Sequence, residues 1–292
     1  MKKYWHRKLL FSIFSIIITA RNKVLKKNTL AEINHISFFR FLKIFRKKFS
    51  YRIEDKIIQF DPAVSGIGWK IYFTGSFEKQ EQEICSKFIK KNSVVFDIGA
   101  NIGLHTVFFS NIAAEGKVYA FEPSRKTYSF LLNNIKNIPN IIPLNIGLAK
   151  ETEILKFYEC ENDAMSGLKN TLRSNVSYES QVVCFSGDDL FKNLPLMGLD
   201  FIKIDVEGLE YDVLLGMEGL LMRFMPIIFC EIYGGINSNQ NPEKTIEYLI
   251  NTGYIAFVLR NNILIPYAAH NDNEYNYFFI PAERLIEFSL SK

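Results

Sequence analysis

The sequence predicts an α/β protein with a doubly wound, mostly parallel sheet, and three observations lead to this prediction. From residue 77, short apolar strand-like runs alternate with segments whose apolar residues recur at helical spacing. A glycine-rich turn follows the first buried run, at residues 99–103. Acidic residues end two later runs, at Glu122 and Asp205. Because right-handed crossovers bring the carboxyl ends of parallel strands to one edge, a ligand should bind there.

The elements follow from these patterns in order. Before the regular part, RIEDKIIQF (52–60) and GWKIYF (68–73) predict short strands. The predicted helices are 77–90, 102–113, 124–136, one carrying Val213, Leu214, Met217, Leu220 and Leu221 on one face, and 243–251. The predicted strands are 93–97, 117–122, 141–144, 201–205, 227–232, 255–260 and 276–281, with an inserted hairpin at 152–158 and 181–185.

The composition indicates a globular protein with an unevenly distributed charge. Hydrophobic residues make up 48% of the 292 residues and charged residues 23%. Residues 1–52 contain 14 Lys or Arg and a single acid, so their net charge is +13. We therefore predict a basic helical extension over 1–52 and a catalytic domain over 53–292, with attraction of the extension to an anionic surface. The alternative is a solvated basic helix with no partner.

Residues 9–20 (LLFSIFSIIITA) are uncharged. As a helix they would be about 18 Å long, shorter than a membrane's hydrocarbon core. The segment could be an interfacial helix, a signal-peptide core, or a helix packed on the domain, and no convincing cleavage site follows it. We favour the first and third equally.

The cysteines, at 85, 160, 184 and 230, show no zinc or redox spacing and indicate a reducing compartment. We therefore predict a cytoplasmic protein with peripheral membrane contact through residues 8–27.

The segment FDIGANIG (96–103) is the strongest local signal for ligand binding. Asp97 ends a buried strand, and Gly99 and Gly103 bracket the turn into a helix. Their G-x-x-x-G spacing differs from the G-x-G-x-x-G of dinucleotide sites. S-adenosylmethionine has no pyrophosphate, and a carboxylate near the turn can accept a hydrogen bond from its ammonium group. Glu122, 25 residues after Asp97, ends the next strand, where an acid can accept both ribose hydroxyls.

The segment FIKIDVEGLE (201–210) places several ionisable side chains at the end of a later strand. Lys203 and Asp205 share one face of that strand, because side chains alternate, and Glu207 and Glu210 follow. Such a group indicates a catalytic or binding edge. The alternative is that the acids stabilise the amino terminus of the next helix.

These motifs in this order resemble the FkbM-type methyltransferases over residues 74–283. The resemblance rests on TGSFE (74–78), FDIGANIGLHT (96–106), YAFEPS (119–124), NIGL (145–148), KIDVEGLEYDVLLGME (203–218) and NYFFIP (276–281). It implies a class I, Rossmann-like methyltransferase fold, S-adenosylmethionine as donor, and O-methylation of a sugar, glycan or natural product. The donor site would then include Asp97, Gly99, Asn101, Gly103 and Glu122. Asp188, in a GDDL segment where the family usually has an apolar residue in place of Gly187, would lie near the adenine.

The chemical step requires alignment of the acceptor and removal of its proton. Asp205 or Glu207 could be the general base with Lys203 orienting it, or Asp205 and Glu231 could hold a divalent ion. We favour the metal-free arrangement, because no His or Asn joins these acids. His105 is a further candidate base, although such a histidine more often lies on a helix surface or forms a structural hydrogen bond.

Other functions are less well supported. A nicotinamide-dependent dehydrogenase would need a third glycine and a Tyr-Lys pair or His, and a non-catalytic donor-binding or glycan-assembly module would show no turnover. A nucleic-acid methyltransferase usually has an N-P-P-[FYW] loop where this chain has DVEG, and the basic residues do not trace a groove. We therefore predict a small-molecule or glycan acceptor and no nucleic acid.

Overall fold

The computed structural model describes Ser12 and residues 49–285, except 62–64, 173, 193, 195, 235–241 and 272–273. The predicted helix at 8–27 therefore lies outside the described residues, apart from Ser12. The chain divides into two compact units, one comprising residues up to Glu78 with Glu161–Ala164, and the other Lys79–Cys160 with Met165 onward. Among the described helices, none is long and apolar enough to cross a membrane.

The first unit contains a hairpin and a helix. Strands β1 (Phe49–Ile53) and β2 (Lys56–Phe60) pair antiparallel. The prediction that GWKIYF is a strand was wrong, because these residues lie in helix α3 (Gly66–Thr74). Ser65 caps the helix by accepting the Gly68 N–H at 3.0 Å, and Gly75 ends it in a left-handed conformation. These two caps outweigh the short strand-like alternation between them.

The second unit is built on an eight-stranded sheet with the order β12-β11-β13-β10-β9-β3-β4-β5. The strands are β3 (Val94–Ile98), β4 (Lys117–Phe121), β5 (Ile141–Leu144), β9 (Phe201–Ile204), β10 (Ile227–Glu231), β11 (Tyr254–Arg260), β12 (Ile263–Pro266) and β13 (Asn276–Pro281). The strands from β10 to β5 in this order are parallel, and β13, β11 and β12 are antiparallel to their neighbours. This confirms the predicted doubly wound, mostly parallel sheet.

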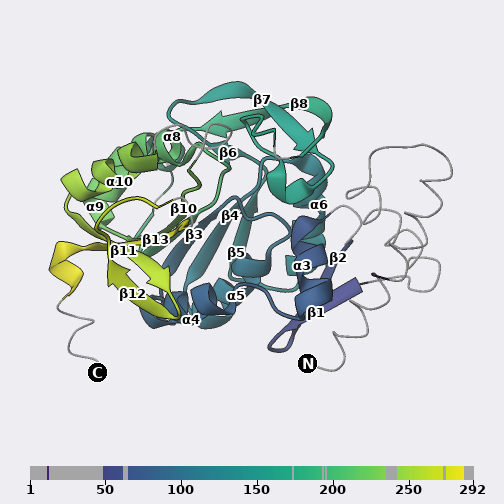
Figure 1. Ribbon diagram of the computed structural model, residues 1–292, viewed down its shortest axis with the longest axis horizontal. Helices are drawn as coiled ribbons and strands as arrows, with labels where there is room; N and C mark the ends of the chain where they lie inside the picture. Colours follow the sequence, from purple (N-terminus) through teal and green to yellow (C-terminus); the bar gives the residue numbers. More distant parts are fainter. Residues whose placement is uncertain are drawn as a thin grey trace. The chain divides into compact units, whose positions relative to one another are not determined.

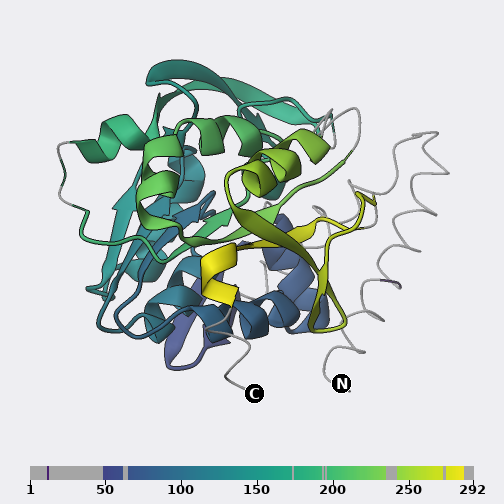
Figure 2. The same cartoon turned by 90° about the vertical axis from the view of Figure 1, so that its left-hand side faces the viewer.

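Helices cover both faces of this sheet, as Figures 1 and 2 show. They are α4 (Lys79–Phe88), α5 (Leu104–Ile112), α6 (Arg125–Ile135), α7 (Gly187–Lys192), α8 (Glu210–Leu215), α9 (Glu218–Phe224) and α10 (Pro242–Asn251). The chain moves from β3 to β4 and β5 in one direction and from β9 to β10 in the other. Right-handed crossovers therefore place α5 and α6 on one face and α8 and α9 on the opposite face.

One departure from the predicted elements has a local cause. The helix predicted after β9 divides into α8 and α9 around Gly216, whose missing side chain lets Ala149 approach. A Cβ at Gly216 would lie 2.0 Å from the Ala149 carbonyl oxygen. The predicted inserted hairpin is present as β7 (Glu153–Cys160) and β8 (Val176–Phe185), which form a small sheet with β6 (Gly147–Leu148).

Candidate functional site

The turn between β3 and α5 contains the first group of predicted donor-binding residues. Asp97 is fully buried at the end of β3, and its Oδ2 accepts a hydrogen bond from Thr106 Oγ1 at 2.5 Å. Gly99 has φ of +80°, and a Cβ there would lie 1.9 Å from the backbone oxygen of Asp205. Asn101 also has a positive φ, of +50°. The turn therefore approaches β9 more closely than a side chain would permit.

Glu122 connects this turn to the end of β4. Its Oε2 accepts the Asn101 backbone N–H and its Oε1 accepts the Ser124 backbone N–H, both at 2.9 Å. The carboxylate is buried, and it holds the glycine turn in register with the amino terminus of α6. A carboxylate oxygen has two lone pairs, so in principle it can accept from a ribose hydroxyl as well as from a backbone N–H.

Lys203 is the charged centre of the strand edge. Its side chain is only 4% exposed, and its Nζ lies 3.2 Å from Asp205 Oδ2 and 3.9 Å from Asp97 Oδ1. Asp97 and Lys203 are register partners on the parallel strands β3 and β9. Asp205 is 31% exposed. A buried ammonium thus orients a carboxylate that reaches solvent.

The loop after β9 has an unusual backbone held by a buried acid. Glu207 and Gly208 have φ values of +59° and +100°, and such strain often marks functional sites when it occurs at a non-glycine residue. The Gly208 N–H donates to Glu210 Oε1 at 2.8 Å. Burial raises the pKa of Glu210 to about 7. Glu210 thus lies in the first turn of α8, where an acid was predicted to stabilise the helix terminus. It also fixes the loop after β9 through its hydrogen bond with Gly208.

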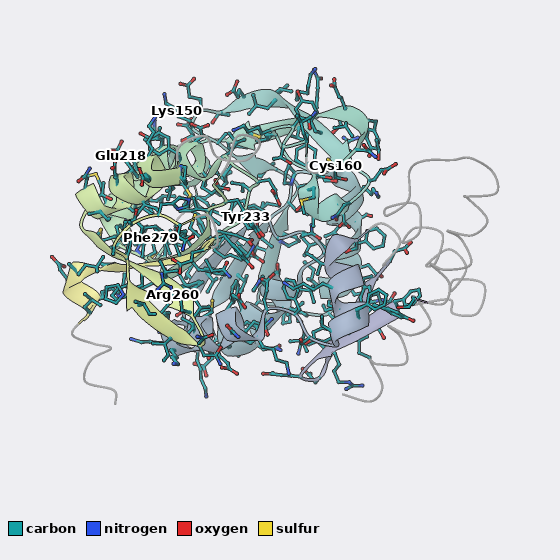
Figure 3. The ribbon with its side chains drawn as sticks, in the orientation of Figure 1. Lys150, Cys160, Glu218, Tyr233, Arg260 and Phe279 are labelled. Atoms are coloured by element: carbon teal, nitrogen blue, oxygen red, sulfur yellow. The ribbon has the colours of Figure 1, made fainter. Side chains whose placement is uncertain are left out.

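Glu231 ends β10 and lies beside a pair of stacked tyrosines, neither of which was predicted to be a site residue. Tyr233, labelled in Figure 3, donates its hydroxyl to Glu231 Oε1 at 2.8 Å. Its ring stacks on Tyr275, with ring centroids 4.6 Å apart and 15° between the planes. Tyr275 precedes β13, which runs antiparallel to β10 and so begins at the edge where β10 ends. Only the antiparallel direction of β13 would have placed Tyr275 at this edge, and the sequence pattern does not specify that direction.

Asp188 and His105 lie in different surroundings. Asp188 accepts the backbone N–H groups of Gly219 and Leu220 at 2.8 and 2.9 Å, at the start of α9. In the structure it thus stabilises a helix terminus, and its predicted place near the adenine stays a prediction. His105 is buried in α5 and stacks on Phe109.

The edge formed by β3 and β4 fits the donor that the sequence predicts. Asp97 Oδ1 is buried and accepts no hydrogen bond within the described part of the chain. An ammonium group would supply a donor to this oxygen, because a buried acceptor atom without a hydrogen bond is costly. Among the described residues, no three His, Cys, Asp or Glu side chains are grouped so that they could hold a metal ion.

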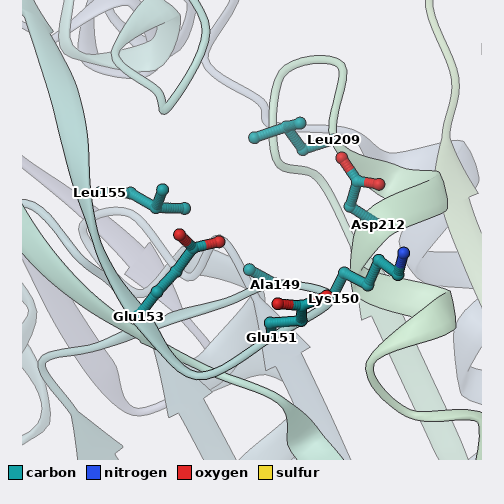
Figure 4. Close-up of a pocket in the computed structure, with 7 residues that line it drawn as sticks. All are labelled: Ala149, Lys150, Glu151, Glu153, Leu155, Leu209 and Asp212. Atoms are coloured by element: carbon teal, nitrogen blue, oxygen red, sulfur yellow. The ribbon is translucent and has the colours of Figure 1, made fainter.

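A separate open pocket of about 250 Å³ lies between the start of β7 and α8 (Figure 4). Its lining consists of Ala149, Lys150, Glu151, Glu153, Leu155, Leu209 and Asp212. None of the predicted site residues lines it, although Leu209 directly precedes Glu210. The pocket therefore lies beside the loop after β9 without including the predicted site residues.

Comparisons with known proteins agree with the motifs. A model of the methyltransferase FkbM domain matches residues 97–256, more than half of the chain. The chain is 31% identical over 164 residues to the hexuronic acid methyltransferase AglP of Haloferax volcanii, and 24% identical over 160 residues to the 2-O-methyltransferase NoeI of Sinorhizobium fredii. These matches cover 56% and 50% of the chain and 65% of each relative, less than two thirds of their length.

A solved structure of methyltransferase FkbM from Methylobacillus flagellatus KT also resembles the chain. It has a TM-score of 0.45 and 14% identity, and the match covers 71% of this chain and 46% of that protein.

Proposed function

The chain belongs to the FkbM methyltransferase family, whose members use S-adenosylmethionine, and we propose that it methylates a hydroxyl group of a sugar or glycan. A relative named a hexuronic acid methyltransferase supports a sugar acceptor, and a relative named a 2-O-methyltransferase supports transfer to an oxygen atom. The observation that carries the proposal is the Lys203–Asp205 pair at the strand edge. A sugar hydroxyl is a weak acid, so its methylation needs a nearby base.

The donor would be held at the ends of β3 and β4. Asp97 would bind its ammonium group through Oδ1, and Glu122 would accept the ribose hydroxyls. Gly99 and Gly103 keep side chains out of the turn, and Asn101 supplies the N–H that fixes Glu122. When bound, S-adenosylmethionine supplies an electrophilic methyl group whose bond to sulfur breaks as the bond to the acceptor oxygen forms.

Asp205 would remove the acceptor proton. Its carboxylate is oriented by Lys203 and is partly exposed, so it can face an acceptor. Glu207 and Glu231 flank it on the same edge, on the loop after β9 and at the end of β10.

The test compares Asp205→Asn and Glu207→Gln in the full chain. A radiolabelled donor and fractionated cell extract identify the acceptor, and turnover is then measured on it. We expect Asp205→Asn to lower turnover by about 10²–10⁴, the usual size of base assistance, and donor affinity by calorimetry to stay nearly unchanged. Glu207→Gln should lower turnover by a similar factor of about 10²–10⁴, because Glu207 is the second candidate base.

Normal turnover in both variants would remove these acids from the proton transfer. Loss of activity with a chelator, restored by magnesium or manganese, would favour the alternative in which Asp205 and Glu231 hold an ion. Label recovered only in a non-carbohydrate product would contradict the proposed acceptor class.

A further inference from the structure

Two stacked tyrosines lie at the same strand edge as the proposed base. Tyr275 is 38% exposed although one part of its ring is covered by Tyr233. Residues outside a core that retain such stacking present a flat, fixed aromatic surface. The Ile232 N–H donates to the Tyr275 carbonyl at 2.8 Å, which fixes the backbone of this pair to the end of β10.

The tyrosine pair is close to the proposed base. Cys230 and Ile204 are register partners on the parallel strands β10 and β9, so Glu231 and Asp205 occupy the next positions along the same edge. Tyr233 donates to Glu231. Burial, followed by the charge of Glu231, raises the pKa of the Tyr233 hydroxyl, and the charge of Asp205 contributes to the same shift. Tyr233 therefore stays a neutral phenol at physiological pH.

We propose that Tyr275, Tyr233 and Glu231 form the acceptor subsite, in which a sugar ring packs on the exposed face of Tyr275 and a sugar hydroxyl bonds to the Tyr233–Glu231 pair. This inference rests on the proposed function. The C–H groups on one face of a pyranose are apolar and match an aromatic ring, whereas its hydroxyls need acceptors such as a phenol oxygen and a carboxylate. A subsite with both surfaces orients a sugar so that one hydroxyl faces Asp205.

The test measures sugar binding directly and needs no turnover. Methyl α-D-glucopyranoside, methyl α-D-mannopyranoside and methyl α-L-rhamnopyranoside are the probes, with glycerol as a hydroxylated compound that has no ring face. Saturation-transfer NMR is recorded on the full chain with S-adenosylhomocysteine present. We expect transfer to the ring C–H protons of at least one glycoside and none to glycerol.

Substitutions then locate the contact. Tyr275→Ala should weaken glycoside binding by about 3- to 10-fold, the factor expected for one aromatic stacking contact, while Tyr275→Phe should restore it. Tyr178→Ala is the matched control, because Tyr178 is an exposed tyrosine, at 51%, on strand β8. Affinity for S-adenosylhomocysteine, measured by calorimetry, should be equal in all variants, which also shows that each is folded.

Two failures can be distinguished. If the wild type binds a glycoside and Tyr275→Ala binds it equally well, the subsite is wrong and the proposed function stands. If the wild type binds no glycoside and the radiolabelled methyl group appears on a non-carbohydrate acceptor, both the subsite and the proposed acceptor class are wrong. Tyr233→Phe provides a second test, because it keeps the ring and removes the hydrogen bond to Glu231.

Discussion

A buried lysine ammonium needs charged or polar partners, and Lys203 has two carboxylates beside it. The sequence predicted this arrangement in part. Side chains alternate along a strand, so Lys203 and Asp205 had to share a face. The second partner, Asp97, follows from the parallel register of β3 and β9, which a single strand's pattern does not contain.

Glu210 gives a prediction about stability and pH. Its pKa is raised by burial from 4.5 to about 7, so the folded chain binds the Glu210 proton more tightly than the unfolded chain. The contribution of this group to the free energy of unfolding therefore falls as pH rises between those values, by about 3 kcal/mol in total. Glu210→Gln does not titrate. The free energy of unfolding of Glu210→Gln, relative to that of wild type, should therefore rise by about 3 kcal/mol between pH 4.5 and pH 8.

Chemical unfolding at pH 4.5, 6 and 8 measures this difference. Glu115→Gln is the control, because it makes the same Glu-to-Gln change at an exposed position. Parallel pH profiles for wild type and Glu210→Gln would show that folding does not raise the pKa of Glu210.

Among the helices and strands, the correct predictions were those whose sequence pattern lies within the element itself. The strand, turn and helix around β3 and α5 carry their own apolar runs and glycines, so they were predicted within two residues of their observed bounds. GWKIYF failed because its caps, Ser65 and Gly75, lie outside the six residues that suggested a strand. The short edge strand β12 was not predicted, and its exposed residues give no alternation signal.

The residues of the site were likewise predictable where the pattern of their own strand places them. Asp97, Glu122, Asp205 and Glu231 end parallel strands, so the predicted fold alone was enough to expect them along one edge. Their catalytic and binding roles stay predictions. Tyr275 could not be placed with them, because it precedes a strand whose antiparallel direction is set by its partner β10.

The β3–α5 turn gives a prediction at this scale. Gly99→Ala puts a side chain at φ +80° and 1.9 Å from the backbone oxygen of Asp205, which is part of a paired strand end and has little room to move. We expect a loss of about 3 kcal/mol in the free energy of unfolding and weaker binding of S-adenosylhomocysteine. Chemical unfolding and calorimetry measure the two effects.

Gly198→Ala is the matched control, because a Cβ there meets nothing within 4 Å. Its stability should stay within about 0.5 kcal/mol of wild type. If Gly99→Ala matched that control, the close approach of the turn to β9 would not constrain the fold.

On the scale of the whole molecule, basic and acidic residues are unevenly distributed along the sequence. Residues 1–52 have a net charge of +13 and the remaining 240 residues have −9. A basic segment on an acidic body is drawn to anionic surfaces, and each near-surface basic residue adds about 1 kcal/mol at low salt.

We predict that the full chain associates reversibly with vesicles of phosphatidylcholine and phosphatidylglycerol through residues 8–27, and not with phosphatidylcholine alone. Sedimentation should fall steeply as ionic strength rises, since screening shortens the range of the attraction. Reversing Lys8, Lys23 and Lys26 to glutamate should weaken association by at least about 100-fold, whereas reversing the exposed Lys87, Lys117 and Lys136 of the second unit should have little effect. Equal sedimentation of both triple variants would contradict a role for residues 8–27. Retention in membranes after high-salt and carbonate washing would instead indicate insertion, because surface electrostatics alone cannot resist those conditions.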